Sequence, residues 1–235
     1  MTGTQQRKRQ PARRSQADRR ELSQERILDA AEELFARRGY DGVTMREIAT
    51  ASGADTALLH YYFETKAGLF DAVVARRASL VNETRQASLE AYATSHAGRM
   101  TAEGVLRAYL EPTFRFMMSG DPGTLNYGAL IAKLNSTAMG GDVDTTHTPF
   151  DPVVGRLVDL LADVRPEVPK ADLYWYYHFV SGAISLSLAQ TGRIDVLSAG
   201  LCRSDDFATI LDRMVRVLGH GFAALVPQTG KAAVR

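Results

Sequence analysis

The chain has 235 residues, of which 45% are hydrophobic and 23% are charged, a composition typical of a folded globular protein. Its single cysteine, Cys202, excludes a disulfide within the chain and a cysteine-based zinc cluster. No apolar run approaches the roughly 20 residues that cross a bilayer, and residues 1–21 lack the apolar core of a secretory signal. We therefore expect a soluble protein of the cytoplasm.

Basic side chains gather at the N-terminus. Residues 1–20 carry seven of them against a single acidic residue, so this segment has a net charge of +6. The remaining 215 residues hold 21 basic and 26 acidic side chains, a net charge of −5. We expect residues 1–21 to form a disordered basic arm that binds a polyanion. The alternative is a solvated tail that only keeps the protein in solution.

Beyond residue 22 the apolar residues recur with helical spacing almost throughout, which predicts an all-α fold of about nine helices. Ser23, Thr44 and Asp55 are candidate N-caps, because their side chains can accept hydrogen bonds from free N–H groups. Gly39 is the candidate stop of the first helix. The first four helices are expected at about 23–38, 45–51, 55–62 and 66–93.

A second group of helices is expected beyond residue 101. Pro112 lies inside the first of them, where it removes a backbone donor and crowds the preceding turn, so we expect a kink. Residues 138–149 are rich in Gly, Thr and Asp and predict a flexible loop. The expected helices of this group span about 105–117, 125–135, 151–165, 172–190 and 205–224.

Three short helices within about 40 residues, with a tight turn at Gly53 between the second and the third, have the layout of a helix-turn-helix. In such a unit two helices brace a third, whose N-terminal end can enter a DNA major groove. The residues follow two patterns, Ile27-Leu28-x-Ala30-Ala31-x2-Leu34-Phe35-x3-Gly39-Tyr40 and Thr44-x3-Ile48-Ala49-x2-Ser52-Gly53-x5-Leu59-x-Tyr61-x-Phe63-x2-Lys66-x2-Leu69-Phe70. Together they resemble the DNA-binding domain of the tetracycline-repressor (TetR) family of transcriptional regulators.

The candidate phosphate contacts lie at helix starts and on one aromatic side chain. Thr44 and Lys66 stand where free N–H groups and the helix dipole favour an anion, although Thr44 can also serve as a cap alone. Tyr61 is similar to the family tyrosine that donates its hydroxyl to a phosphate; its alternative role is that of an aromatic brace. Arg46 can reach a phosphate or a guanine, or it is an ordinary surface arginine.

The candidate base contacts open the third helix. Thr56 can hydrogen-bond a base or a phosphate, and Ala57 and Leu58 can pack on thymine methyl groups. His60 is a further candidate contact. The resemblance thus implies double-stranded DNA as the partner.

The chain divides into four predicted parts. Residues 1–21 are the basic arm, 22–70 the helix-turn-helix domain, 71–226 a domain for ligand binding and dimerisation, and 227–235 a disordered tail. The helix expected at 172–190 is apolar on two faces, so both must be covered. The resemblance implies that the last two helices pair with their copies in a four-helix bundle, which makes a two-fold homodimer. The alternative is that both helices are simply core of one chain.

A cavity between helices is the expected site of a small effector. Aromatic and methionine side chains favour a lipophilic compound, fatty-acyl or aromatic, with a polar group that Asn135 or His178 recognises. A short stretch at 173–182 also resembles effector domains of regulators of fatty-acid metabolism. Each of these residues can instead be ordinary core. The nine candidates are Phe114, Met117, Met118, Tyr127, Leu130, Asn135, Trp175, His178 and Phe179.

We therefore predict a ligand-responsive transcriptional regulator: a repressor that binds a palindromic operator as a dimer and is released by its effector. The competing class, an enzyme, lacks sequence support, because the five histidines are scattered and no phosphate-binding, dinucleotide or nucleophile motif is present. No cofactor and no metal site are predicted. A DNA-binding protein without ligand control is the second alternative.

Overall fold

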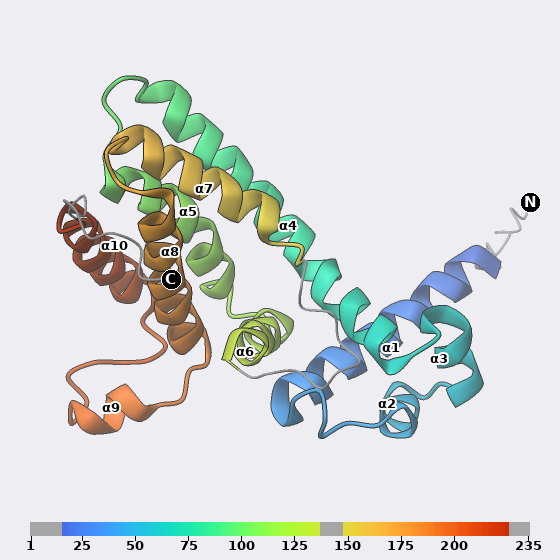
Figure 1. Cartoon of the computed structure of the whole chain (residues 1–235). Helices are drawn as coiled ribbons and strands as arrows, with labels where there is room; N and C mark the ends of the chain where they lie inside the picture. The colour runs from blue at the N-terminus through green and yellow to red at the C-terminus, as the bar shows by residue number, and fades with distance from the viewer. Residues whose placement is uncertain (1–15, 137–147, 226–235) are drawn as a thin grey trace, which may run out of the picture.

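The computed structural model describes residues 16–136 and 148–225, and these residues form ten α-helices and no strand. Three helices make a unit at one end, and the long α4 runs from this unit into a second bundle (Figure 1). None of the ten helices is both long enough and apolar enough to span a membrane. The helices are α1 (Gln16–Arg38), α2 (Met45–Ser52), α3 (Thr56–Phe63), α4 (Lys66–Ser95), α5 (Ala102–Met117), α6 (Pro122–Ser136), α7 (Asp151–Val164), α8 (Lys170–Leu188), α9 (Arg193–Leu197) and α10 (Phe207–Ala223).

The all-α prediction is confirmed, and two details differ from it. The five-residue α9 was not predicted, because a helix this short shows no periodicity. Helix α1 begins at Gln16 instead of next to Ser23, so residues 16–21 of the expected disordered arm are helical. These residues contain no helix breaker, and Asp18 in the first turn complements the helix dipole. Residues 1–15, most of the predicted loop and the C-terminal tail lie outside the described residues.

Local chemistry sets the turns of the N-terminal unit. Gly39 and Gly53 adopt φ angles of +74° and +66°, which end α1 and α2 in the left-handed region. The Asp55 side chain accepts a hydrogen bond from Ala57 N at 2.9 Å and so caps α3 as predicted. In the turn into α4, Thr65 Oγ1 accepts from Gly68 N at 3.0 Å. A Cβ atom on Gly68 would overlap the carbonyl oxygen of Phe63, so only glycine fits there without a shift of the α3–α4 turn.

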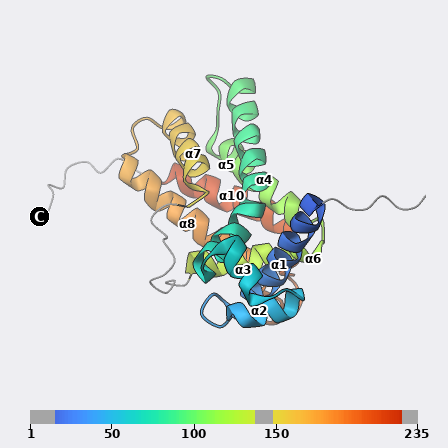
Figure 2. The ribbon, with the colours of Figure 1, turned by 90° about the vertical axis from the view of Figure 1, so that its right-hand side faces the viewer.

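Helix α6 lies at the junction of the two units. It packs against α1 on one side and α8 on the other, and the two ribbon views place it next to α1 (Figures 1 and 2). Lys133 of α6 donates to the carbonyl oxygen of Arg37 at 3.0 Å, which connects α6 to the end of α1.

Buried ion pairs join α1 to α4. Glu32 of α1 is only 2% exposed and accepts from Arg76 Nη2 at 2.6 Å and from Arg77 Nε at 3.3 Å. Arg76 also binds the carboxylate of Asp29 at 2.8 Å. Arg77 lies 4.0 Å from Asp121, directly before α6. The Glu32 carboxylate therefore sits where α1, α4 and the start of α6 come together.

Gly68→Ala should lower the free energy of unfolding by about 1–3 kcal/mol, because the new methyl group meets backbone. The matched control is Gly155→Ala on α7, where no heavy atom lies within 4 Å of the new Cβ. It should raise stability by up to about 1 kcal/mol through helix propensity alone. Denaturant unfolding of both variants checks the pair; an unchanged stability of Gly68→Ala contradicts the close approach.

Candidate nucleic-acid interface

One side of helix α3 is exposed, and the other side packs against the core of the unit. Leu59 is fully buried and Leu58 partly so, and both pack against the core of the unit. Ala57 and His60 are exposed, and Thr56 is half-buried at the start of the helix. Since the opening turn of α3 is accessible, its side chains and N–H groups can meet base edges and phosphates.

Thr44 and Glu47 form a capping box at the start of α2. Thr44 Oγ1 donates to Glu47 Oε2 at 2.8 Å and accepts from Glu47 N at 3.3 Å. Arg38 binds the other carboxylate oxygen at 2.9 Å. The hydrogen bond from Thr44, followed by that from Arg38, lowers the pKa of Glu47 to about 2. The capping role of Thr44 is thus present, and its phosphate contact stays a prediction.

An arginine that the sequence analysis assigned to a disordered arm lies beside α3. Tyr61 is 67% exposed, and the guanidinium of Arg20 lies 5.5 Å from the ring centres of both Tyr61 and Tyr62. Arg20 reaches them because α1 extends back to Gln16. Its positive charge therefore stands beside the ring whose hydroxyl is expected to meet a phosphate. Sequence reasoning missed this placement because residues 16–21 contain no large apolar residue whose spacing would predict a helix.

The other candidates are distributed around α2, α3 and α4. Lys66 is the first residue of α4, and its Nζ atom lies 4.1 Å from the ring centre of Tyr40. Arg46 is exposed on α2. The Nδ1 atom of His60 lies 2.8 Å from the carbonyl oxygen of Glu64 at the end of α3, which holds the ring in place. Seven of the eight predicted DNA contacts belong to the unit of α1–α3, and the eighth, Lys66, begins α4 directly after it.

Comparison with protein families agrees with this geometry. Residues 27–73 match the model of the bacterial regulatory proteins of the tetR family, and residues 107–221 match that of the tetracyclin repressor-like C-terminal domain. The chain belongs to the TetR family of transcriptional regulators. This family consists of DNA-binding transcriptional regulators, not of enzymes.

Individual relatives are similar mainly in the DNA-binding part. An uncharacterised HTH-type transcriptional regulator of Mycobacterium tuberculosis is 47% identical over 60 residues, which are 26% of this chain and 30% of that protein. YttP of Bacillus subtilis, inferred to be an HTH-type transcriptional regulator, is 31% identical over 85 residues, 36% of this chain and 39% of YttP. The chain thus matches about a third of the length of these relatives.

Solved structures are similar over most of the chain. A protein from Shewanella sp. PV-4, described as a tetR family transcription regulator, has a TM-score of 0.58 at 15% identity and covers 85% of this chain and 97% of its own. The haemolysin II transcriptional regulator HlyIIR has a TM-score of 0.55 at 20% identity, with coverages of 83% and 97%. At these identities the likeness concerns the fold.

The nine predicted ligand residues of this TetR-family regulator do not come together. Four are buried in the second bundle, namely Phe114, Met117, Tyr127 and Leu130. Asn135 is exposed, although its Nδ2 atom donates to Ser185 Oγ at 3.0 Å. The other four are also exposed, namely Met118, Trp175, His178 and Phe179.

Trp175 and His178 were expected to line a cavity between helices, but neither side chain faces the interior of the described chain. Helix α8 is apolar on two faces, and the face with Tyr176, Val180 and Ile184 is the one that packs into the bundle. The opposite face, with Trp175, points away from the core. Periodicity shows that both faces are apolar but does not show which one meets the interior of the same chain.

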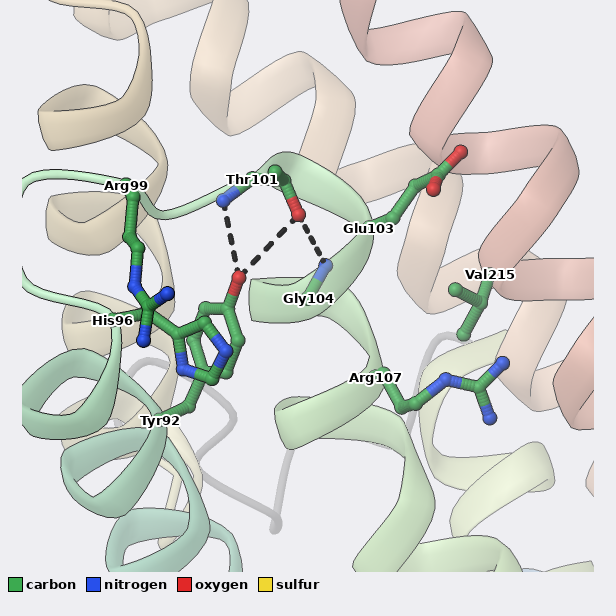
Figure 3. Close-up of a pocket in the computed structure, with 8 residues that line it drawn as sticks. All are labelled: Tyr92, His96, Arg99, Thr101, Glu103, Gly104, Arg107 and Val215. Atoms are coloured by element: carbon green, nitrogen blue, oxygen red, sulfur yellow. Dashed lines mark hydrogen bonds between the residues drawn. The ribbon is translucent and has the colours of Figure 1, made fainter.

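A surface hollow of about 430 Å³ lies at the end of α4 remote from α1–α3 (Figure 3). Tyr92 closes one side, where its hydroxyl accepts a hydrogen bond from Thr101 N at 3.1 Å and its ring stacks on His96. Arg107 lies on the opposite side and binds Asp212 at 2.8 Å. The hollow contains none of the predicted ligand residues.

Lys66→Ala should weaken binding to a random-sequence DNA duplex and reduce the salt dependence of that binding by about one released counterion. Thr56→Ala should instead change the preferred base at one position of a selected site. The control is Lys170→Ala, which removes an exposed lysine at the start of α8. If Lys66→Ala keeps the salt slope of the unmodified protein, the phosphate contact is refuted.

Proposed function

We propose that this regulator is a repressor that binds a near-palindromic operator as a homodimer and leaves it when a small effector binds the second bundle. The observation that carries the dimer is an apolar face without a covering element in the described chain. On α8, Trp175 and Phe179 are each 61% exposed and Leu186 is 70% exposed. Large exposed apolar faces of this kind are typical of protein interfaces.

The same face extends onto α10. Tyr176 of α8 donates its hydroxyl to the carbonyl oxygen of Leu218 at 2.7 Å, and its ring packs against Phe222. These contacts hold α8 and α10 together, and Val217 of α10 is also largely exposed. A second copy that lays its own α8 and α10 on this surface completes a four-helix bundle. Gly182 in the middle of the α8 face favours a close approach of the two copies.

A two-fold dimer supports operator binding, because it presents two α3 helices to successive turns of the major groove, roughly 34 Å apart. The basic residues before α1 add affinity for phosphates without base preference. Arg20, next to Tyr61, extends this positive charge to the recognition helix. DNA as the partner implies a cytoplasmic location.

Release from DNA requires contacts that carry a change in the second bundle to the unit of α1–α3. Helix α6 packs against both α8 and α1, and Glu32 ties α1 to Arg76 and Arg77 of α4. An effector that binds more tightly to a different arrangement of α4 and α6 shifts the position of α1–α3. Such a shift changes the separation of the two α3 helices and weakens operator binding.

Light scattering of the full chain should give twice the chain mass of 25.7 kDa. Leu186→Glu places a charge in the proposed interface and should yield monomers with much weaker operator binding. Val196→Glu is the matched control, because Val196 is also a highly exposed apolar residue but lies on α9. Equal masses for the two variants, or a folded monomer of the unmodified protein, contradict the dimer.

Selection of binding sites from random DNA identifies the operator. The expected outcome is an inverted repeat, and the dimeric Val196→Glu variant should bind it like the unmodified protein. Selected sites that contain one unrepeated element contradict the two-fold mode of binding. A reporter gene placed behind the selected site should fall in expression when the protein is present; a rise contradicts the repressor role.

A further inference from the structure

Arg85 of α4 is a buried cation that meets no anionic partner in the part of the chain that the structure describes. It is only 5% exposed, and its guanidinium lies 4.5 Å from the ring centre of Tyr109 on α5. Its Nε atom has no hydrogen-bond partner, and no carboxylate pairs with it among residues 16–136 and 148–225. Arg76 and Arg77, two turns earlier on the same helix, both bind Glu32. A buried charge is costly unless something pairs with it.

Two further buried polar groups without partners come from the next two helices. These are Thr113 Oγ1 on α5 and Tyr127 Oη on α6. Thr113 follows Tyr109 by one helical turn on α5. The ring of Tyr127 packs against that of Phe116 on the same helix, with 6.1 Å between the two ring centres. Burial raises the pKa of Tyr127, while the positive charge of Arg85 acts to lower it. Arg85 thus acts on Tyr127, and Thr113 lies one turn along α5 from the tyrosine that Arg85 contacts.

We propose that Arg85, Thr113 and Tyr127 together bind the carboxylate group of a lipophilic monocarboxylate, which is the effector of this regulator. The guanidinium and the two hydroxyl groups are hydrogen-bond donors, and an arginine binds a carboxylate through two parallel bonds. A neutral or cationic compound would leave the Arg85 charge unpaired. The inference rests on the proposed function and specifies the chemical class of its effector.

The surroundings suit the apolar part of such a molecule. Met117 and Leu130 are buried one helical turn beyond Thr113 on α5 and Tyr127 on α6. The Sδ and Cε atoms of Met117 lie 2.9 and 2.5 Å from where a Cβ of Gly128 would stand. Since methionine has three rotatable bonds, Met117 can move aside and admit an alkyl or aryl chain.

The site also has a route to the DNA-binding unit. Tyr127 lies on α6, which packs against α1. Its hydroxyl is close enough to Glu32 and Arg77 for both charges to act on its pKa, together with that of Arg85. A carboxylate bound to Arg85 and Tyr127 adds a negative charge near the junction that Glu32 holds. Binding and release from DNA are therefore coupled through α6.

The test uses the full chain with octanoate, decanoate and 4-phenylbutanoate, each compared with its methyl ester. Calorimetry and thermal unfolding report binding without DNA. At least one acid should bind and raise the melting temperature, and its ester should bind at least tenfold more weakly. Arg85→Met keeps an unbranched apolar stem, removes the charge and should weaken acid binding at least tenfold.

The control is Arg115→Gln, which removes an exposed arginine of α5 and should bind the acids like the unmodified protein. Arg85→Met without ligand should melt no lower than the unmodified protein, because it removes an unpaired buried charge. Should it fail to fold, Thr113→Val and Tyr127→Phe take its place, and each should weaken acid binding severalfold.

The proposal is overturned if no acid binds, if acids and esters bind equally, or if the variants at positions 85, 113 and 127 keep full affinity for the acids. Operator binding by the unmodified protein is measured separately, without any ligand. Its absence would contradict the proposed function, whereas a selective response to acids would still support the carboxylate site.

Discussion

The carboxylate of Glu32 is the constraint on which the relation of the two units depends. It is buried on α1, and the two arginines that neutralise it, Arg76 and Arg77, stand on α4. Breaking a buried pair from one side leaves the partner charge uncompensated, at a cost of about 3 kcal/mol or more. Separating this part of α4 from α1 therefore costs a large fraction of the free energy of folding. A movement of this part of α4 therefore carries α1 with it, which is what the proposed release from DNA requires.

The sequence predicted the DNA-binding unit well, because its structure depends on local chemistry. Glycines that need positive φ angles, the caps at Thr44 and Asp55, and apolar residues at helical spacing all act within a few positions of each other. The start of α1 was missed because a prediction from local pattern needs apolar residues at regular spacing. Residues 16–22 have no apolar stripe, so periodicity gives no signal, yet they place Arg20 beside Tyr61.

The second bundle was less predictable, because its site depends on contacts between distant segments. The sequence showed two apolar faces on α8 but not that Trp175 lies on the outer one. Nor did it indicate Arg85, which looks like any arginine of a long helix until the ring of Tyr109 is seen to lie 4.5 Å from its guanidinium. A cation is recognised as unpaired only when all of its neighbours are known, and these come from α5 and α6.

Native-state hydrogen exchange of Glu32→Gln tests most directly whether the buried carboxylate holds the two units together. The matched control is Glu33→Gln, since Glu33 is exposed and pairs with Arg37 one turn away on the same helix. In Glu32→Gln the amides of α1–α3 should exchange roughly a hundredfold faster, as expected for the loss of about 3 kcal/mol, while those of α8 and α10 keep their rates. Glu33→Gln should exchange like the unmodified protein. Unchanged protection of α1–α3 in Glu32→Gln, or an equal loss throughout both units, would contradict the account.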